Sequence, residues 1–285
     1  MLIIMPGHGE LAGVLAANIA YTGAFYVYFL LEQERLGDWR KACLSCLLFG
    51  IFPGSVYFSA AYSESTMLLA VLLAIYWTRR NRVGWAGIVS GLAAVARPPG
   101  FTLPVSLFIA YYNKWDKKMR IQFTVLSSIF LCVFLGYLQW KFGNMLIFTR
   151  MEGLVYKRHF IFLPLLIIKE LQFGVTHQGG TGLLLVNLWA LGVAFVVLCQ
   201  KGGWVPKSYS LLSLLILGNN GLFADNVEPM FGMFRYILVL PGIYLLVTDM
   251  CVNTKRKWMI TTVLIVFVFF AMLIGISVGQ KAFIS

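Results

Sequence analysis

Two charged side chains stand out in this chain because each lies beside helix-breaking residues at the end of an apolar stretch. Glu64 lies in the run Tyr62-Ser63-Glu64-Ser65, and Arg97 is followed by Pro98-Pro99-Gly100. A carboxylate can orient an attacking hydroxyl group or act as its general base, and a guanidinium can hold a phosphate with its planar fork of N–H donors. A charged group at the end of a membrane span is costly, so its presence there predicts a functional site.

Both side chains also have simpler interpretations. Glu64 could be a carboxylate in the first turn of a helix, where it favours the helix dipole, with Ser63 as the N-cap residue. Arg97 could reach from a helix end to the membrane interface. The two prolines and the glycine after Arg97 predict a non-helical turn, which favours the functional interpretation of this residue.

The composition predicts the elements that hold these residues. The chain has 285 residues, of which 60% are hydrophobic and 12% are charged, whereas a soluble domain has about 25% charged residues. Long unbroken apolar runs predict helices, because a helix satisfies its own backbone polar groups in lipid. The sequence therefore predicts an all-α fold, a polytopic transmembrane helical bundle of about 8–10 spans, some of them short or broken.

The spans follow from the apolar runs and the breaks between them. We expect span 42–60 to break at Phe52-Pro53-Gly54, and spans 83–96 and 101–112 are each too short to cross a bilayer untilted. Residues 141–180 are predicted to form an extracytoplasmic segment with an amphipathic interfacial helix over 160–173. The whole chain, 1–285, is predicted to be one transmembrane domain. The predicted spans are 11–31, 42–60, 66–77, 83–96, 101–112, 121–140, 181–198, 208–223, 234–248 and 258–278.

The positive charges predict the orientation of the bundle, because cytoplasmic loops carry an excess of Lys and Arg. Alternating sides at each span places fifteen of the 23 basic residues on one face, which we interpret as cytoplasmic. Glu64, Arg97, the segment 141–180 and Arg235 then share the extracytoplasmic face. The fifteen are Arg35, Arg40, Lys41, Arg79, Arg80, Arg82, Lys114, Lys117, Lys118, Arg120, Lys201, Lys207, Lys255, Arg256 and Lys257.

Several other classes of function find no support in the sequence. The net charge of +12 is explained by the cytoplasmic loops, so no nucleic-acid partner is predicted. Cys43-x-x-Cys46 has a metal-binding spacing but lacks a second pair and lies in an apolar span, so no metal site is predicted. No glycine-rich nucleotide motif is present in a strand-turn-helix context, and no cofactor is predicted.

The runs around Glu64 and Arg97 resemble the PIG-V-like mannosyltransferases, which include the enzyme that adds the second mannose to GPI anchors. The family pattern is a proline, an apolar stretch and Tyr-Ser/Thr-Glu-Ser, then about 30 residues later an arginine followed by Pro or Ser and Gly. Two further stretches are similar to later family motifs. The four matching stretches are Phe52–Ser65, Leu92–Gly100, Gly143–Phe148 and Phe234–Pro241.

The resemblance implies an integral membrane glycosyltransferase of the GT-C class in a cell membrane, or in the endoplasmic reticulum membrane of a eukaryote. It would transfer mannose from a polyprenyl-phosphate-linked donor to a lipid-linked or glycan acceptor on the extracytoplasmic face. Glu64 is then the candidate catalytic carboxylate. The residues expected to bind the donor or its phosphate are Tyr62, Ser63, Arg97, Arg158, His159 and Arg235.

One feature departs from the family pattern. Leu11–Asn18 is similar to about the third helix of the family, so the acidic loop after the family's first helix has no counterpart here. We therefore expect a fragment or divergent member, or a chain completed by a partner subunit. The alternative is a non-catalytic membrane protein of the same fold, a transporter or a scaffold, since broken helices also form transporter sites.

Overall fold

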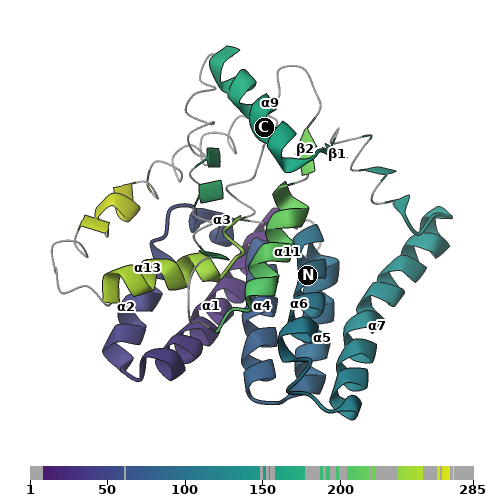
Figure 1. The fold of residues 1–285 in the computed structure, drawn as a ribbon, viewed down its shortest axis with the longest axis horizontal. Coiled ribbons are helices and arrows are strands. Elements are labelled where there is room, and N and C mark those ends of the chain that lie inside the picture. Colours follow the sequence, from purple (N-terminus) through teal and green to yellow (C-terminus); the bar gives the residue numbers. More distant parts are fainter. Residues whose placement is uncertain are drawn as a thin grey trace. The chain divides into compact units, whose positions relative to one another are not determined.

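The structure of this protein is a computed structural model. It describes residues 9–60, 62–147, 150–151, 154, 158–176, 187–188, 191–192, 197–198, 204–218, 220–222, 237–252, 262–263, 265–269 and 272. These residues form two compact units (Figure 1). The first unit comprises Met1–Asn81, Gln200–Val205 and Leu238–Ser285, and the second comprises Arg82–Cys199 and Pro206–Ile237.

The first unit packs four helices and one short helical turn around an aromatic core. Its longest helix, α1, contacts α2, α3 and α4, and α13 contacts α2. The ring of Phe49 lies 4.9 Å from that of Tyr28 and 4.7 Å from that of Tyr244. Offset and edge-on aromatic pairs of this kind stabilise a core beyond the area they bury. The helices are α1 (Gly9–Leu36), α2 (Trp39–Gly50), α3 (Val56–Ser59), α4 (Glu64–Arg79) and α13 (Gly242–Val252).

The second unit joins helices to a small antiparallel ladder. Helix α6 packs against α5 and α11, and β2 follows directly after α11 and pairs with β1. The prediction of a helical fold is confirmed, with these two three-residue strands as the addition. The elements are α5 (Val83–Ala96), the 3-10 turn η1 (Pro98–Phe101), α6 (Thr102–Tyr111), α7 (Lys117–Phe142), β1 (Arg158–Phe160), α9 (Leu163–Thr176), α11 (Lys207–Gly218) and β2 (Asn220–Leu222).

Helices α5 and α7 approach each other closely through a row of glycines. A Cβ added at Gly87 would lie 3.1 Å from the backbone oxygen of Phe123, and one added at Gly91 would lie 2.6 Å from that of Ser127. Small residues spaced by four let two helix backbones approach, which is a frequent arrangement between membrane helices. The opposite face of α7 is exposed and apolar, with Ile121 55% and Val125 54% exposed.

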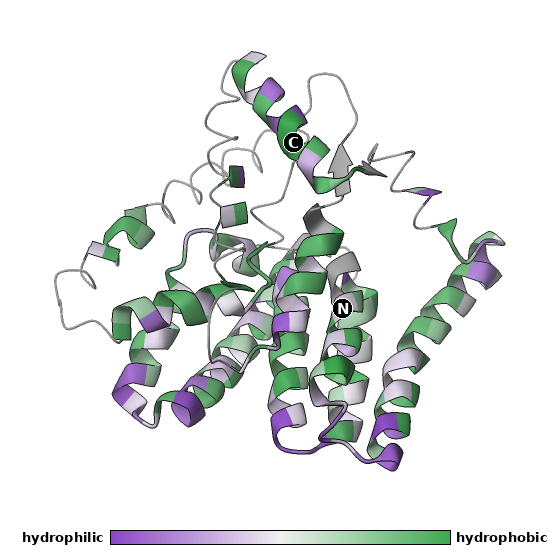
Figure 2. Cartoon of the chain, in the orientation of Figure 1, coloured by the Kyte–Doolittle hydropathy of each residue, from purple (hydrophilic) through white to green (hydrophobic). Residues whose placement is uncertain are grey.

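The broken spans of the sequence appear as broken helices. The predicted break at Phe52-Pro53-Gly54 separates α2 from α3, where Gly54 takes a positive φ of 91°. The helices α1, over Leu11–Leu36, and α7, over Lys117–Phe142, are long and apolar enough to cross a membrane. Figure 2 shows hydrophobic residues along such helices and hydrophilic residues gathered at their ends. A multi-pass arrangement stays a prediction, and predicted spans 181–198 and 258–278 lie largely outside the described residues.

Helix α9 occupies the position of the predicted interfacial helix. Its exposed side chains include Leu165, Ile168 and Val175, whereas its buried side includes Glu170. Asn187 Nδ2 donates to Glu170 Oε1 over 2.8 Å. A helix that exposes its apolar face and buries a carboxylate has the reverse of the polarity expected in water, which is typical of a helix facing lipid.

Candidate functional site

Arg97 lies in a turn whose shape is set by its neighbours. It ends α5 in an extended conformation, with φ −159° and ψ 155°, as expected for a residue that precedes proline. Gly100 N–H then donates to Arg97 O over 2.8 Å. A Cβ added at Gly100 would lie 1.8 Å from Ala93 O, so only glycine fits where the turn folds back on α5. Arg97 is non-helical, as predicted, whereas the residues after it form the 3-10 turn η1 rather than an irregular turn.

This turn packs against α11, which runs antiparallel to α6. Thr102 Oγ1 lies 2.7 Å from Ser213 Oγ, and Ser208 Oγ donates to Ser106 O over 3.1 Å. Because Thr102 begins α6 and pairs with the later of the two serines, the C-terminal end of α11 points toward the Arg97 end of the unit. Hydrogen bonds between Ser and Thr side chains and a neighbouring helix are a common contact between membrane helices.

The strand that carries Arg158 and His159 is attached to the same end of α11. Helix α11 ends at Gly218, and β2 begins two residues later (Figure 1). In the β1–β2 ladder Arg158 pairs with Leu222, and His159 pairs with Gly221. The structure describes the backbone of these two candidates and not their side chains. It therefore brings three predicted residues, Arg97, Arg158 and His159, to one end of the second unit, whereas Arg235 lies outside the described residues.

Glu64 lies in the first unit, at the first position of α4. It is fully buried, while the preceding Tyr62 and Ser63 are exposed. Ser63 occupies the N-cap position of α4, as predicted, but in an αR conformation and without a side-chain cap hydrogen bond. Ser65 instead donates from its hydroxyl to Phe58 O, which ties α4 to α3. The carboxylate of Glu64 is therefore placed where the helix dipole favours a negative charge.

Short contacts fix the loop that leads to Glu64. Asn18 Nδ2 donates to Ser59 O over 3.0 Å, which joins α1 to the end of α3. The ring of Tyr21 stacks on Phe58 at 5.2 Å, and the ring of Tyr62 lies 6.2 Å from that of Tyr57. The Tyr21 hydroxyl is buried and has no hydrogen-bond partner among the residues that the structure describes. The short helix α3, which precedes the Tyr-Ser-Glu-Ser run, is thus held in place by its contacts with α1.

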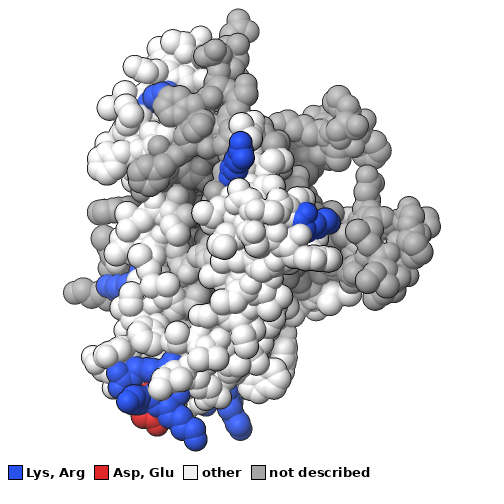
Figure 3. Space-filling model, turned by 90° about the vertical axis from the view of Figure 1, so that its right-hand side faces the viewer, with Lys and Arg blue, Asp and Glu red and all other residues white. Residues whose placement is uncertain are grey.

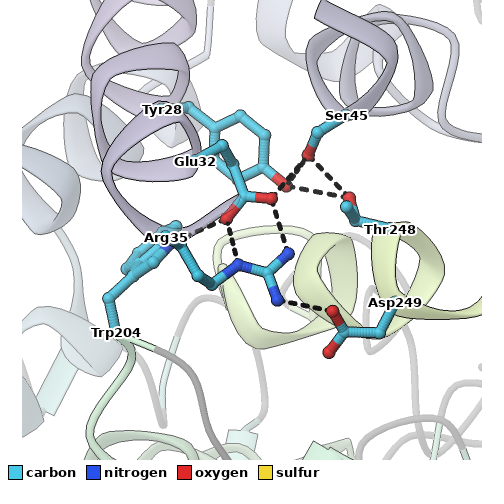
Figure 4. A network of polar contacts seen from close by, with 7 residues as sticks. All are labelled: Tyr28, Glu32, Arg35, Ser45, Trp204, Thr248 and Asp249. Atoms are coloured by element: carbon cyan, nitrogen blue, oxygen red, sulfur yellow. Dashed lines mark hydrogen bonds and ion pairs between the residues drawn. The ribbon is translucent and has the colours of Figure 1, made fainter. Parts of the chain in front are cut away.

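A second polar cluster in the first unit was not predicted from the sequence (Figure 4). We call it the Glu32 network. It joins α1, α2, α13 and the segment around Trp204, and Glu32 at its centre is fully buried. Its members are Tyr28, Glu32, Arg35, Ser45, Trp204, Thr248 and Asp249.

The carboxylate of Glu32 receives hydrogen bonds on both oxygens. Oε1 accepts from Arg35 Nε at 2.8 Å and from Trp204 Nε1 at 2.9 Å. Oε2 accepts from Arg35 Nη2 at 2.7 Å and from Ser45 Oγ at 2.8 Å. Arg35 also donates from Nη1 to Asp249 Oδ1 at 2.5 Å. A buried carboxylate with a bidentate arginine and two further donors is fully satisfied, so this network holds segments together rather than reacting.

Three hydroxyl groups extend the network away from the charges. Ser45 Oγ lies 3.0 Å from the Tyr28 hydroxyl and 2.6 Å from Thr248 Oγ1. The sequence placed Glu32 and Arg35 in a cytoplasmic charged run, and the one local signal was their spacing of three on a helix. Ser45, Trp204 and Thr248 are too distant in sequence for spacing to reveal them.

Comparison of the chain with protein-family models, with curated proteins and with solved structures found no match. Within the described part of the chain, no three His, Cys, Asp or Glu side chains are grouped so that they could hold a metal ion.

Proposed function

We propose that this protein is a multi-pass membrane mannosyltransferase that uses a polyprenyl-phosphate-linked mannose donor on the extracytoplasmic face. The proposal is supported by the resemblance of the runs around Glu64 and Arg97 to the PIG-V-like family, and by the two long apolar helices. The observation that carries it furthest is the glycine-dependent turn at Arg97, which has α11 packed against it and the Arg158–His159 strand at the same end.

In this mechanism a cation of the second unit holds the donor phosphate. Arg97 suits the role because a guanidinium keeps its charge and binds phosphate in a bidentate manner. An acceptor hydroxyl oxygen forms the new bond to the anomeric carbon, while the bond from that carbon to the phosphate oxygen breaks and its electron pair leaves with the phosphate. Phosphate is a good leaving group, so positioning and charge stabilisation supply most of the rate.

Glu64 receives its role from the resemblance. The resemblance implies that this carboxylate of the first unit orients the acceptor hydroxyl and takes its proton. The buried position at the start of α4 is consistent with a carboxylate whose direction is fixed by the backbone.

The test is mannose transfer from polyprenyl-phosphate mannose, measured in membranes that contain the full chain. Arg97→Ala is expected to reduce transfer at least about 100-fold, and Arg97→Lys to restore part of it because lysine keeps the charge but loses the fork. Arg82→Ala, at the other end of α5, is the matched control. Membrane insertion and a monodisperse elution profile show that each variant is intact.

Retained transfer in Arg97→Ala would remove the phosphate role. If the intact wild-type chain transfers no mannose from any polyprenyl-phosphate donor, the non-catalytic alternative, a transporter or scaffold of the same fold, takes its place.

A further inference from the structure

A group of cations surrounds the turn between α6 and α7, which we call the basic corner. Lys114, Lys117 and Lys118 are exposed, and Arg120 follows one turn into α7. The acidic residue among them is Asp116, whose Oδ1 accepts from Met119 N–H at 2.7 Å as the N-cap of α7. Figure 3 shows Lys and Arg side chains gathered at one end of the face on which α7 lies.

These cations lie at the end of α7 that least favours them. The first turn of a helix carries a partial positive charge, which stabilises anions and repels cations. The first turn of α7 has no acidic residue. Among the described residues, no Asp or Glu forms an ion pair with any of the four cations. The carboxylate of Asp116 already caps this helix end, so an anion from outside the chain would be attracted by the exposed lysine side chains around it.

Aromatic rings hold the basic corner in shape. The guanidinium of Arg120 lies 4.4 Å from the centre of the Tyr112 ring, and Lys114 Nζ lies 5.1 Å from that of Tyr111. Trp115 is buried at 2% exposure between Tyr111 and Phe123, with ring centres 5.6 and 4.8 Å away. Aromatic residues next to cations at the end of an apolar helix are typical of the headgroup level of a bilayer.

The exposed apolar face of α7 begins directly beside the basic corner. It starts at Ile121, the residue after Arg120, and continues at a spacing of four residues along the helix. A phospholipid has the same order, with its phosphate above its acyl chains. The exposed residues of this face are Ile121, Val125, Ile129, Val133 and Tyr137.

We propose that the basic corner binds the headgroups of anionic phospholipids in the adjacent leaflet. The lysines attract the phosphates, and the apolar face of α7 contacts the acyl chains below them. This inference rests on the membrane placement of α7 in the proposed function and is independent of glycosyl transfer. Each lysine near a membrane surface contributes about 1 kcal/mol, or about fivefold in affinity, so three contribute about 100-fold.

The experiment titrates the full chain, purified in a neutral detergent, with phosphatidylglycerol and with phosphatidylcholine. The wild-type chain is expected to prefer phosphatidylglycerol, and the preference should fall as salt rises because exposed charges are screened. The triple variant Lys114→Gln, Lys117→Gln, Lys118→Gln is expected to weaken phosphatidylglycerol binding about 100-fold and to leave phosphatidylcholine binding unchanged.

The matched control is the triple variant Lys141→Gln, Arg150→Gln, Lys169→Gln, which removes the same number of charges; Lys141 lies in the last turn of α7, and its Nζ also lies over an aromatic ring, 5.5 Å from the centre of Tyr137. It should retain wild-type affinity, which would assign the preference to the basic corner rather than to net charge. Equal losses in the two variants would overturn the proposal. So would displacement of the lipid by inorganic phosphate or by a short RNA at equal charge concentration.

A separate measurement keeps this outcome distinct from the proposed enzyme activity. Flotation of the wild-type chain with neutral phosphatidylcholine vesicles reports membrane placement alone. Failure to float would overturn both the membrane placement and the lipid site. Flotation together with phosphatidylglycerol preference, but without mannose transfer, would leave the lipid site standing and reject only the enzyme.

Discussion

Two polar regions of the first unit differ in whether their buried polar groups have hydrogen-bond partners. In the Glu32 network, the Tyr28 hydroxyl lies within hydrogen-bond distance of Ser45, and Glu32 accepts four hydrogen bonds. Near Glu64, on the ring that stacks on Phe58, the hydroxyl of Tyr21 is buried with no hydrogen-bond partner among the described residues. Tyr21 and Tyr28 belong to the same helix, two turns apart.

The difference separates two uses of polar residues in an apolar protein. A satisfied network fixes the segments that it joins, because removing any member leaves another buried polar group without its partner. A buried hydroxyl left without a partner, such as that of Tyr21, costs stability, and proteins retain such costs most often at functional sites. The Glu32 network therefore has a structural role, and the Glu64 region is the better candidate for a catalytic site.

The largest expected loss of stability comes from Arg35→Leu. It leaves the buried charge of Glu32 without its ion-pair partner, so the free energy of unfolding should fall by about 3–5 kcal/mol. The measurement is unfolding in mixed micelles, followed by the fluorescence of the chain. Arg79→Leu is the control, because Arg79 pairs with Glu34 at 2.6 Å with the two side chains 31% and 41% exposed. It should cost about 1 kcal/mol or less, and equal costs would contradict a special role for the Glu32 network.

A smaller loss is expected for Ser45→Ala. This change removes one donor to Glu32 Oε2 and the neighbour of the Tyr28 and Thr248 hydroxyls, which should cost about 1–3 kcal/mol. Ser90→Ala tests another buried serine, whose hydroxyl donates to Gly87 O within its own helix. Its loss strands no charged group, so its cost should be under about 1 kcal/mol. Unfolding in the same mixed micelles compares the two, and a cost for Ser90→Ala that matches Ser45→Ala would argue against the network as the cause.

The two tyrosines should respond with opposite signs. Tyr28→Phe removes a bonded hydroxyl and should lower the free energy of unfolding by about 1 kcal/mol. Tyr21→Phe removes an unsatisfied buried hydroxyl and should raise it by about 1 kcal/mol. Thermal unfolding of the two variants measures both changes in the free energy of unfolding. Destabilisation by Tyr21→Phe would show that the Tyr21 hydroxyl has a partner, as the Tyr28 hydroxyl does.

The smallest effect on stability is expected for Glu64→Gln. The amide keeps the shape of the side chain and its capacity to accept a hydrogen bond, and the favourable position of a negative charge at a helix N-terminus is worth about 1 kcal/mol or less. Mannose transfer should fall by about 100-fold or more if the carboxylate acts as the proposed base. Glu34→Gln removes an exposed carboxylate of the same unit and should leave transfer unchanged. A folded, fully active Glu64→Gln would return this residue to a purely structural role.

The sequence was sufficient for those features that depend on neighbouring residues. The broken span at Phe52-Pro53-Gly54, the turn after Arg97 and the long helix α7 all follow from local composition and proline or glycine chemistry. Ser63 shows where local reasoning stops, since the sequence places it at the N-cap of α4 but does not reveal that its side chain makes no cap hydrogen bond. The hydrogen bond from Ser65 to the carbonyl oxygen of Phe58 joins two helices, and the motif does not contain it.

The Glu32 network could not be found from the sequence for a different reason. Its members come from segments up to 220 positions apart, as in the contact between Tyr28 and Thr248. A hydrogen bond between such residues depends on how whole helices pack, and no spacing rule reports it. The attachment of the Arg158–His159 strand to the end of α11 likewise depends on a strand pairing that neither short segment predicts alone.

The turn after Arg97 makes this position suitable for a series of side-chain substitutions. Its backbone path is set by the two prolines that follow it and by the close approach of Gly100 to the backbone oxygen of Ala93. Lysine, glutamine or an unnatural cation can therefore be placed there on one fixed backbone. The response of the protein to such a series would report charge and shape at that point separately from folding.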